Sequence, residues 1–136
     1  MIVGTGCDLT PIQRLEAACR RRPALVGRLF TPAEQASAQA LGARRWERLA
    51  GIFAAKEAVL KALGTGMRVP FADLEVGHDD AGRPLLHLRG QAQDVARALG
   101  IGHWHISIAH DGGLAMATAI AESADMPPLA PPPRTG

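Results

Sequence analysis

Residues 44–63 read RRWERLAGIFAAKEAVLKAL and form the longest helical pattern in the chain. Apolar side chains recur along this segment at helical spacing, and they are Leu49, Ile52, Phe53, Leu60 and Leu63. This period places them on one stripe, as is typical of a helix that packs against a core. The glycines at positions 64 and 66 supply a stop signal. We therefore predict a long central helix from about residue 44 to residue 63.

Three charged residues lie in the second half of this helix. Helical geometry places Lys56 inside the apolar stripe and puts Glu57 and Lys61 together on its edge. In a purely structural interpretation, Lys56 extends from the core edge to solvent, and Glu57 and Lys61 form an i,i+4 pair worth only about 0.2–0.5 kcal/mol. In a functional one, a carboxylate beside two ammonium groups holds a divalent ion and an anionic phosphate chain together. The helix alone does not choose between the two.

A second carboxylate stands near the start of the chain. Ile2 and Val3, with glycines at positions 4 and 6, predict a short buried strand that ends in a turn at residues 6–8. Asp8 is then at the exit of the strand. Two carboxylates with substrate phosphates and water commonly hold magnesium, and Asp8 with Glu57 could supply them. Asp8 could equally accept hydrogen bonds in a local turn or interact with a helix dipole.

Two helix starts are marked by a threonine followed by a proline. Thr10 with Pro11, and Thr31 with Pro32, combine a capping hydroxyl with a proline at the first helical position. An acceptor side chain follows each threonine three residues later, which is typical of a capping box. The first helix should end at about residue 22, where the arginines at 20–22 suit the negative end of the helix dipole.

The rest of the chain predicts an antiparallel sheet and one more helix. Residues 74–76 and 85–88 flank a turn and read as a hairpin, residues 91–99 as a short helix, and residues 103–110 and 114–121 as strands. Alternation in the strand at 103–110 puts His103, His105 and Ser107 on its polar face. That face is either the solvent side of the sheet or, with His110 nearby, a zinc site. The predicted fold class is α+β.

Length and composition exclude several classes of protein. A chain of 136 residues has room for one domain with a real core. A net charge of +2 is too small to favour a nucleic-acid partner, and no apolar run approaches the ~20 residues that span a bilayer. The two cysteines, Cys7 and Cys19, and the lack of a signal-peptide pattern predict a cytoplasmic protein.

The proline-rich end of the chain differs from what precedes it. From residue 126 onward prolines prevent both helix and sheet pairing. We therefore expect one domain over residues 1–122 and a disordered tail over residues 123–136.

Three motifs taken together resemble a known family. The segments are GTGCD at residues 4–8, FAAKEA at residues 53–58 continuing to Lys61 and the glycines at 64 and 66, and HISIAH at residues 105–110. They closely resemble the holo-acyl-carrier-protein synthases, which are small phosphopantetheinyl transferases. The similarity runs from residue 1 to about residue 122, and the combination of motifs is far more specific than any one of them.

The resemblance implies a fold and an activity. The expected fold is the compact 4′-phosphopantetheinyl transferase fold, with an antiparallel sheet packed on a long central helix. The implied reaction transfers the 4′-phosphopantetheine group of coenzyme A to a serine of an apo acyl carrier protein and releases adenosine 3′,5′-bisphosphate. The family also implies a homotrimer whose sites lie between subunits. The resemblance leaves open whether the carrier serves fatty-acid, polyketide or peptide synthesis.

The resemblance also implies roles for individual residues. Asp8 and Glu57 would ligate Mg²⁺, and with Lys61 they would form the catalytic set. The coenzyme A contacts would come from Lys56, Lys61, Gly64 and His105. Of the two lysines, Lys61 is the better candidate for contact with the leaving phosphate, because Lys56 falls in the apolar stripe. Arg14 and Arg21 would face the acidic recognition helix of the carrier protein.

Two departures and two rival functions accompany this hypothesis. Ile52 stands where most relatives have an arginine, which places one phosphate contact in question, and Cys7 precedes Asp8 as a small apolar residue. One rival is a non-catalytic α+β module that binds a nucleotide or a protein helix. The other is a zinc hydrolase that uses His103, His105 and His110. The general base stays unassigned.

Overall fold

The structure is a computed structural model, and it describes residues 1–65 and 68–125. The first half of the chain forms a strand and then helices: β1 (Ile2–Pro11), α1 (Ile12–Arg21), α2 (Ala24–Leu29), α3 (Pro32–Gln39), η1 (Gly42–Arg44) and α4 (Arg45–Leu63). The second half forms η3 (Phe71–Asp73), β2 (Leu74–His78), β3 (Pro84–Leu88), α5 (Gly90–Ala98), β4 (Ile101–Asp111) and β5 (Leu114–Ser123). The predicted tail over residues 123–136 begins too early, because Ser123 is the last residue of β5 and pairs with Ile101. Residues 126–136 lie outside the described residues.

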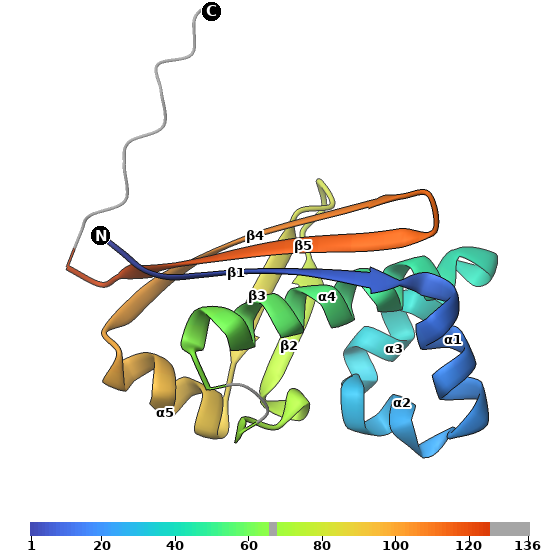
Figure 1. The fold of residues 1–136 in the computed structure, drawn as a ribbon, viewed down its shortest axis with the longest axis horizontal. Helices are drawn as coiled ribbons and strands as arrows, with labels where there is room; N and C mark the ends of the chain where they lie inside the picture. Colours follow the sequence, from blue (N-terminus) through green and yellow to red (C-terminus); the bar gives the residue numbers. More distant parts are fainter. Residues whose placement is uncertain (66–67, 126–136) are drawn as a thin grey trace, which may run out of the picture.

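The strands β1, β5 and β4 form an antiparallel sheet with β5 in the middle. Figure 1 shows this sheet lying along α4, which runs beneath it. The inward-facing residues of β5 are all small and fully buried: Ala115, Ala117, Ala119 and Ala121. Alanines at these positions let the helix backbone come close to the middle strand.

Glycines bring the edge strand β1 equally close to α4. A Cβ atom at Gly6 would lie 1.9 Å from the carbonyl oxygen of Ala58, and one at Gly4 would lie 2.2 Å from that of Ala62. Real Cβ atoms do not approach backbone oxygens so closely. The two glycines are therefore needed for packing against the helix, whereas the sequence had suggested a turn.

The central helix α4 forms the middle of the core. Nearly all of its residues from Leu49 to Leu63 are buried. It ends at Gly64, whose φ of 72° is left-handed and favours glycine. The predicted central helix and its stop signal are confirmed to within one residue.

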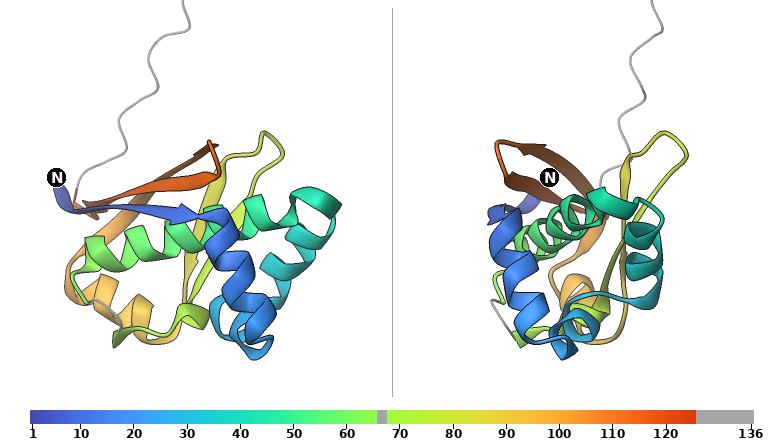
Figure 2. Two further views of the ribbon diagram at one scale, coloured as in Figure 1. Left: turned by 45° about the vertical axis from the view of Figure 1, so that its right-hand side comes forward. Right: turned by 90° about the vertical axis from the view of Figure 1, so that its right-hand side faces the viewer.

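The remaining elements surround the other faces of α4. The β2–β3 hairpin is antiparallel, with its register running from Leu74 opposite Leu88 to His78 opposite Pro84. Figures 1 and 2 show α1, α2 and α3 gathered near one end of α4 and α5 near the other. The predicted α+β class, with an antiparallel sheet packed on a long central helix, is confirmed.

The start of the chain differs from the prediction in two ways. β1 does not end near Gly6 but pairs with β5 as far as Pro11, so Asp8 lies within the strand opposite Ala117. Thr10 is also in the strand and does not cap α1, which begins at Ile12. The second predicted cap is confirmed, since Thr31 and Glu34 form a complete capping box at the start of α3.

None of the helices in the described ranges is long and apolar enough to cross a membrane.

Candidate active site

Asp8, Glu57 and Lys61 lie together where β1 passes over α4. Gly4, Gly6 and Asp8 share the face of β1 that packs on the helix, and the two glycines bring Asp8 close to it. Lys61 Nζ lies 3.3 Å from Asp8 Oδ1 and donates a 2.9 Å hydrogen bond to the carbonyl of Cys7. The structure therefore brings together two residues that are 53 positions apart in the sequence, which the helix pattern alone did not connect.

The two oxygens of Asp8 have different partners. Oδ1 faces Lys61, and Oδ2 accepts a 2.9 Å hydrogen bond from Thr10 Oγ1. The Lys61 side chain is 55% exposed, whereas that of Asp8 is 16% exposed. The ammonium group therefore reaches toward solvent from a carboxylate that is mostly shielded, and an anionic ligand could contact it there.

Glu57 is in an environment that disfavours its charge. Burial raises the pKa of the Glu57 carboxyl, the negative charge of Asp8 raises it further, and Lys61 opposes both effects. With both carboxylates ionised, Asp8, Glu57 and Lys61 together carry a net negative charge. A bound cation would relieve this repulsion.

A pocket of about 630 Å³ opens beside these residues. The charged side chains in its lining are Asp8, Glu57, Lys61 and Arg14. The rest of its wall is mainly apolar and includes Leu15, Leu25, Leu29, Phe53 and Phe71. The rings of Phe53 and Phe71 stack with their centroids 5.6 Å apart. A ligand in this pocket would meet both charged side chains and an apolar surface.

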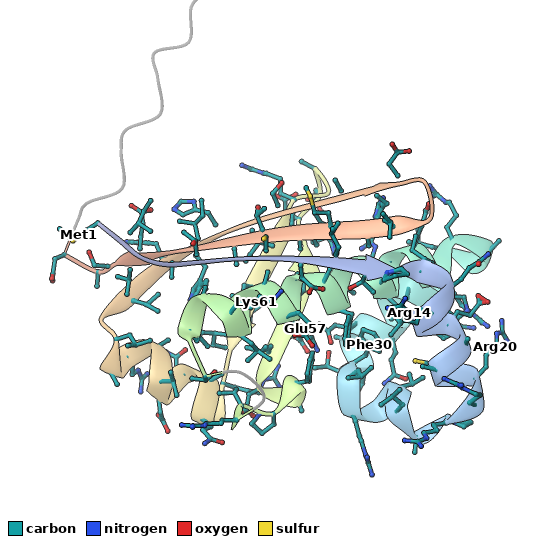
Figure 3. All side chains as sticks on the ribbon, viewed as in Figure 1. Met1, Arg14, Arg20, Phe30, Glu57 and Lys61 are labelled. Carbon is teal, nitrogen blue, oxygen red and sulfur yellow. The ribbon has the colours of Figure 1, made fainter. Side chains whose placement is uncertain are left out.

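Arg14 belongs to the pocket, and Arg21 does not. Figure 3 shows Arg14 on α1 on the same side of the molecule as Glu57 and Lys61 of α4. Arg21 lies in the last turn of α1, exposed and outside the residues that line the pocket. If both residues contact a partner, that partner must extend along α1 from the pocket outward.

The donor set fits magnesium better than zinc. Within residues 1–65 and 68–125, no group of three or more His, Cys, Asp or Glu side chains could hold a metal ion. Zinc sites ordinarily need three or four such ligands, whereas Mg²⁺ is usually bound through one or two carboxylates, water and substrate phosphates. Asp8 and Glu57 supply the two carboxylates.

Lys56 cannot contact a ligand, so its assignment to coenzyme A binding is corrected. Its side chain is fully buried, and its Nζ donates to Glu34 Oε1 at 2.6 Å, to the Leu29 carbonyl at 2.7 Å and to the Phe71 carbonyl at 3.3 Å. Burial lowers the pKa of Lys56, and the charge of Glu34 opposes that shift. Both interpretations of Lys56 drawn from the sequence, contact with solvent and contact with phosphate, were wrong.

The histidines of β4 lie away from Asp8 and Glu57. His105 pairs with Glu122 and lines a separate cavity of about 530 Å³ with His103. His110 lines another cavity beside Arg48 and His78. The three histidines of the zinc hypothesis therefore do not form one site. His105 and Gly64 stay predictions as coenzyme A contacts.

Sequence reasoning missed two polar partners. Thr10 was assigned to a helix cap because a proline follows it, although its spacing of two from Asp8 would place both on one face of a longer strand. Glu34 was recognised as a capping residue, but its carboxylate also accepts hydrogen bonds from Lys56 Nζ and from the backbone N–H of Val76. No local pattern links Glu34 to Lys56, which is 22 residues away.

Comparison with known proteins then identifies the family. A family model described as the 4′-phosphopantetheinyl transferase superfamily matches residues 4–119, a range that contains Asp8, Glu57 and Lys61. The chain belongs to this superfamily. Both the fold class and the family resemblance drawn from the sequence motifs are thereby confirmed.

Similar sequences within the superfamily are named holo-[acyl-carrier-protein] synthase. A holo-[acyl-carrier-protein] synthase of Frankia alni is 45% identical over 122 residues, covering 90% of this chain and 98% of the relative. One from Alkalilimnicola ehrlichii is 45% identical over 128 residues, covering 92% and 100%.

Solved structures from the superfamily have the same fold as this chain. The crystal structure of holo-[acyl-carrier-protein] synthase from Neisseria meningitidis matches with a TM-score of 0.81 and 31% identity, covering 90% of this chain and all of that one. The enzyme from Bacillus anthracis in complex with CoA (3′,5′-ADP) matches with a TM-score of 0.75 and 37% identity, covering 91% and 99%.

Proposed function

We propose that the chain transfers the 4′-phosphopantetheine group of coenzyme A to a serine of an apo acyl carrier protein and releases adenosine 3′,5′-bisphosphate. The observation that carries this proposal is the cluster of Asp8, Glu57 and Lys61 in the lining of a pocket, in a chain of this superfamily. The relatives named holo-[acyl-carrier-protein] synthase, and the relative solved with CoA, support the same substrates.

The proposed metal is Mg²⁺, held by Asp8 and Glu57. Such an ion, when bound, neutralises phosphate oxygens and aligns the transferred group. The carboxylates of Asp8 and Glu57 would provide its protein ligands, and the raised pKa of the Glu57 carboxyl beside Asp8 supports this assignment. The coenzyme A pyrophosphate would complete the coordination.

Lys61 would contribute positive charge to the same phosphates. The reaction is attack by the carrier serine oxygen on the β-phosphorus of coenzyme A, so a P–O bond forms to the serine as the bond to the adenosine bisphosphate breaks. Such a transfer needs alignment and neutralisation of charge on the leaving phosphate. The exposed Lys61 ammonium is a mobile point charge suited to that task.

Arg14 and Arg21 are proposed to bind the carrier protein. Both are exposed on α1, where basic side chains would attract an acidic helix and increase the association rate. Because Arg14 also lines the pocket, a carrier docked on α1 would have its serine close to Glu57 and Lys61. The carrier class stays open, as does the cytoplasmic location predicted from the sequence.

We further propose a homotrimer with sites between subunits, as the family resemblance implies. The outer face of the β1–β5–β4 sheet carries exposed apolar side chains, including Val3, Leu9 and Met116. Exposed apolar side chains gathered on one sheet face commonly mark a protein interface. The separation of His105 from the pocket within one chain is explained if His105 serves the site of a neighbouring subunit.

The deciding experiment measures the mass of apo acyl carrier protein after incubation with the enzyme, coenzyme A and Mg²⁺. A gain equal to one phosphopantetheine group, lost when a chelator is added, is the expected result. Asp8→Ala and Glu57→Ala should each reduce the rate by about 100-fold or more, because the charge stabilisation from a bound metal is worth several kcal/mol. No gain with carriers from fatty-acid, polyketide and peptide synthesis would favour the non-catalytic binding module instead.

A further inference from the structure

The buried Thr10 hydroxyl donates its hydrogen bond to a carboxylate, although a neutral acceptor would satisfy it equally well. Thr10 is 5% exposed, and its Oγ1 donates a 2.9 Å hydrogen bond to Asp8 Oδ2. A buried hydroxyl needs a partner, but a backbone carbonyl would serve as well. A hydroxyl that donates to a carboxylate forms a charge-assisted bond, and such bonds are stronger than neutral ones.

The surroundings leave Thr10 as the group that sets the orientation of Asp8. In the sheet register Asp8 lies opposite Ala117 and Thr10 opposite Ala115, and both alanines are fully buried and apolar. Among the described residues, the side chains that donate hydrogen bonds to the Asp8 carboxylate are Thr10, on Oδ2, and Lys61, on Oδ1. The Lys61 side chain is 55% exposed, so its ion pair with Asp8 Oδ1 can break when a ligand binds.

Glu57 lacks a comparable anchor. In the part of the chain that the structure describes, no hydrogen bond to the Glu57 carboxylate is formed, and burial and Asp8 both disfavour its charge. The two carboxylates thus differ. Hydrogen bonds hold the orientation of the Asp8 carboxylate, whereas no hydrogen bond within residues 1–65 and 68–125 holds that of Glu57.

We infer that Thr10 is a positioning residue for the metal site: it holds Oδ2 of Asp8 so that Oδ1 is presented to the ion. This inference rests on the proposed role of Asp8 as a magnesium ligand. Groups that orient a metal ligand typically contribute 10–100-fold to metal affinity or activity. Thr10 acts through Asp8 and need not touch substrate.

The experiment compares Thr10→Val with the unchanged protein. Valine keeps the shape and strand preference of threonine and removes only the hydroxyl. Mg²⁺ binding is measured by isothermal titration calorimetry with coenzyme A present and no carrier protein, so that no turnover occurs. We expect the dissociation constant for Mg²⁺ to rise about tenfold in Thr10→Val.

A control variant separates positioning from general strand effects. Thr10→Ser keeps the hydroxyl on the same strand position and should bind Mg²⁺ within about twofold of the unchanged protein. If Thr10→Val fails to fold, Thr10→Ala and Thr10→Ser supply the same comparison, because they too differ only in the hydroxyl.

A kinetic measurement adds a second readout. In the transfer assay, Thr10→Val should show a raised apparent KM for Mg²⁺ and a kcat that recovers at saturating Mg²⁺, as expected when affinity alone is impaired. Magnesium affinity in Thr10→Val equal to that of the unchanged protein would overturn the role of Thr10. Absence of Mg²⁺ binding by the unchanged protein would overturn the metal assignment of Asp8, and this inference with it.

Discussion

Lys56 and Glu34 form an ion pair with an N–O distance of 2.6 Å in which both side chains are fully buried. The pair joins the middle of α4 to the first turn of α3. Lys56 also donates to the carbonyls of Leu29 and Phe71, and both of these residues line the pocket proposed as the active site. A network inside the core therefore fixes the pocket wall relative to α4, which carries Glu57 and Lys61.

Breaking this pair from one side should be costly. Lys56→Met leaves the Glu34 carboxylate buried without its counter-charge, which should lower the free energy of unfolding by about 3–5 kcal/mol. The double variant Lys56→Met with Glu34→Gln should lose less, because no charge is left in the core. Urea unfolding followed by circular dichroism measures both. Equal losses in the single and double variants would show that packing, and not the stranded charge, dominates.

Gly6→Ala should damage both stability and activity. The added Cβ would lie 1.9 Å from the Ala58 carbonyl oxygen, so β1 must move away from α4. We expect a loss of about 1–3 kcal/mol, as for other overpacked cores, together with slower transfer because Asp8 moves with its strand. Gly77→Ala is the matched control, since nothing lies within 4 Å of its added Cβ. Thermal melts measure stability, and the transfer assay measures the rate. Equal melting temperatures and equal rates for Gly6→Ala and Gly77→Ala would contradict the prediction.

Glu57→Gln should stabilise the metal-free protein at neutral pH while removing activity. The pKa of Glu57 is raised in the folded state, so above pH about 4.5 the folded protein binds more protons at this group than the unfolded chain does. Its contribution to stability is therefore present at low pH and is lost as pH rises through the folded pKa. In chelator, the advantage of the glutamine variant should grow with pH above about 4.5. A pH-independent difference in unfolding free energy would refute this electrostatic origin.

Arg14→Ala should weaken carrier binding selectively. We expect the KM for apo carrier protein to rise severalfold and the KM for coenzyme A to stay unchanged, because the guanidinium would meet an acidic partner surface. The effect should shrink as salt concentration increases, since exposed charges are screened. Arg97→Ala, on the exposed side of α5, removes the same charge elsewhere. An equal change in both variants would indicate a general charge effect and no docking site.

Met116→Lys should disrupt the proposed trimer without unfolding the chain. Met116 is 43% exposed on the outer sheet face, where an interface would bury the new ammonium group at high cost. Light scattering coupled to size-exclusion chromatography should show a smaller assembly. Leu99→Lys, at the end of α5 and equally exposed at 43%, should leave the assembly unchanged. A monomeric unchanged protein would contradict the trimer directly.

The parts of the fold that local patterns determine were predictable from the sequence. The apolar stripe and Gly64 defined α4, and Thr31 with Glu34 defined the start of α3. The start of the chain was mispredicted because Gly6 has two uses, in a turn and at a close backbone contact, and only tertiary packing distinguishes them. The same error hid the strand geometry that places Thr10 beside Asp8.

The site was predictable only through the family motifs. Nothing in the spacing of Asp8 and Glu57 shows that they meet, since the contact depends on how β1 crosses α4. The position of Lys56 on the apolar stripe did signal burial, but its partner Glu34 lies on another helix and is joined to it only in the fold. Such long-range contacts carry no local periodicity from which they could be inferred.

No loop separates β1 from α1, since the strand ends at Pro11 and the helix begins at Ile12. The φ of Pro11 is −65°, and the N–H of Ile12 donates a 3.0 Å hydrogen bond to the Gly113 carbonyl in the turn between β4 and β5. Asp8 and Arg14 thus belong to one continuous stretch of backbone without a hinge. The distance between the proposed ion ligand, Asp8, and the proposed docking residue, Arg14, is therefore fixed by this short backbone segment. A carrier protein bound to α1 would lie at a constant distance from the reaction centre without a closing movement of the enzyme.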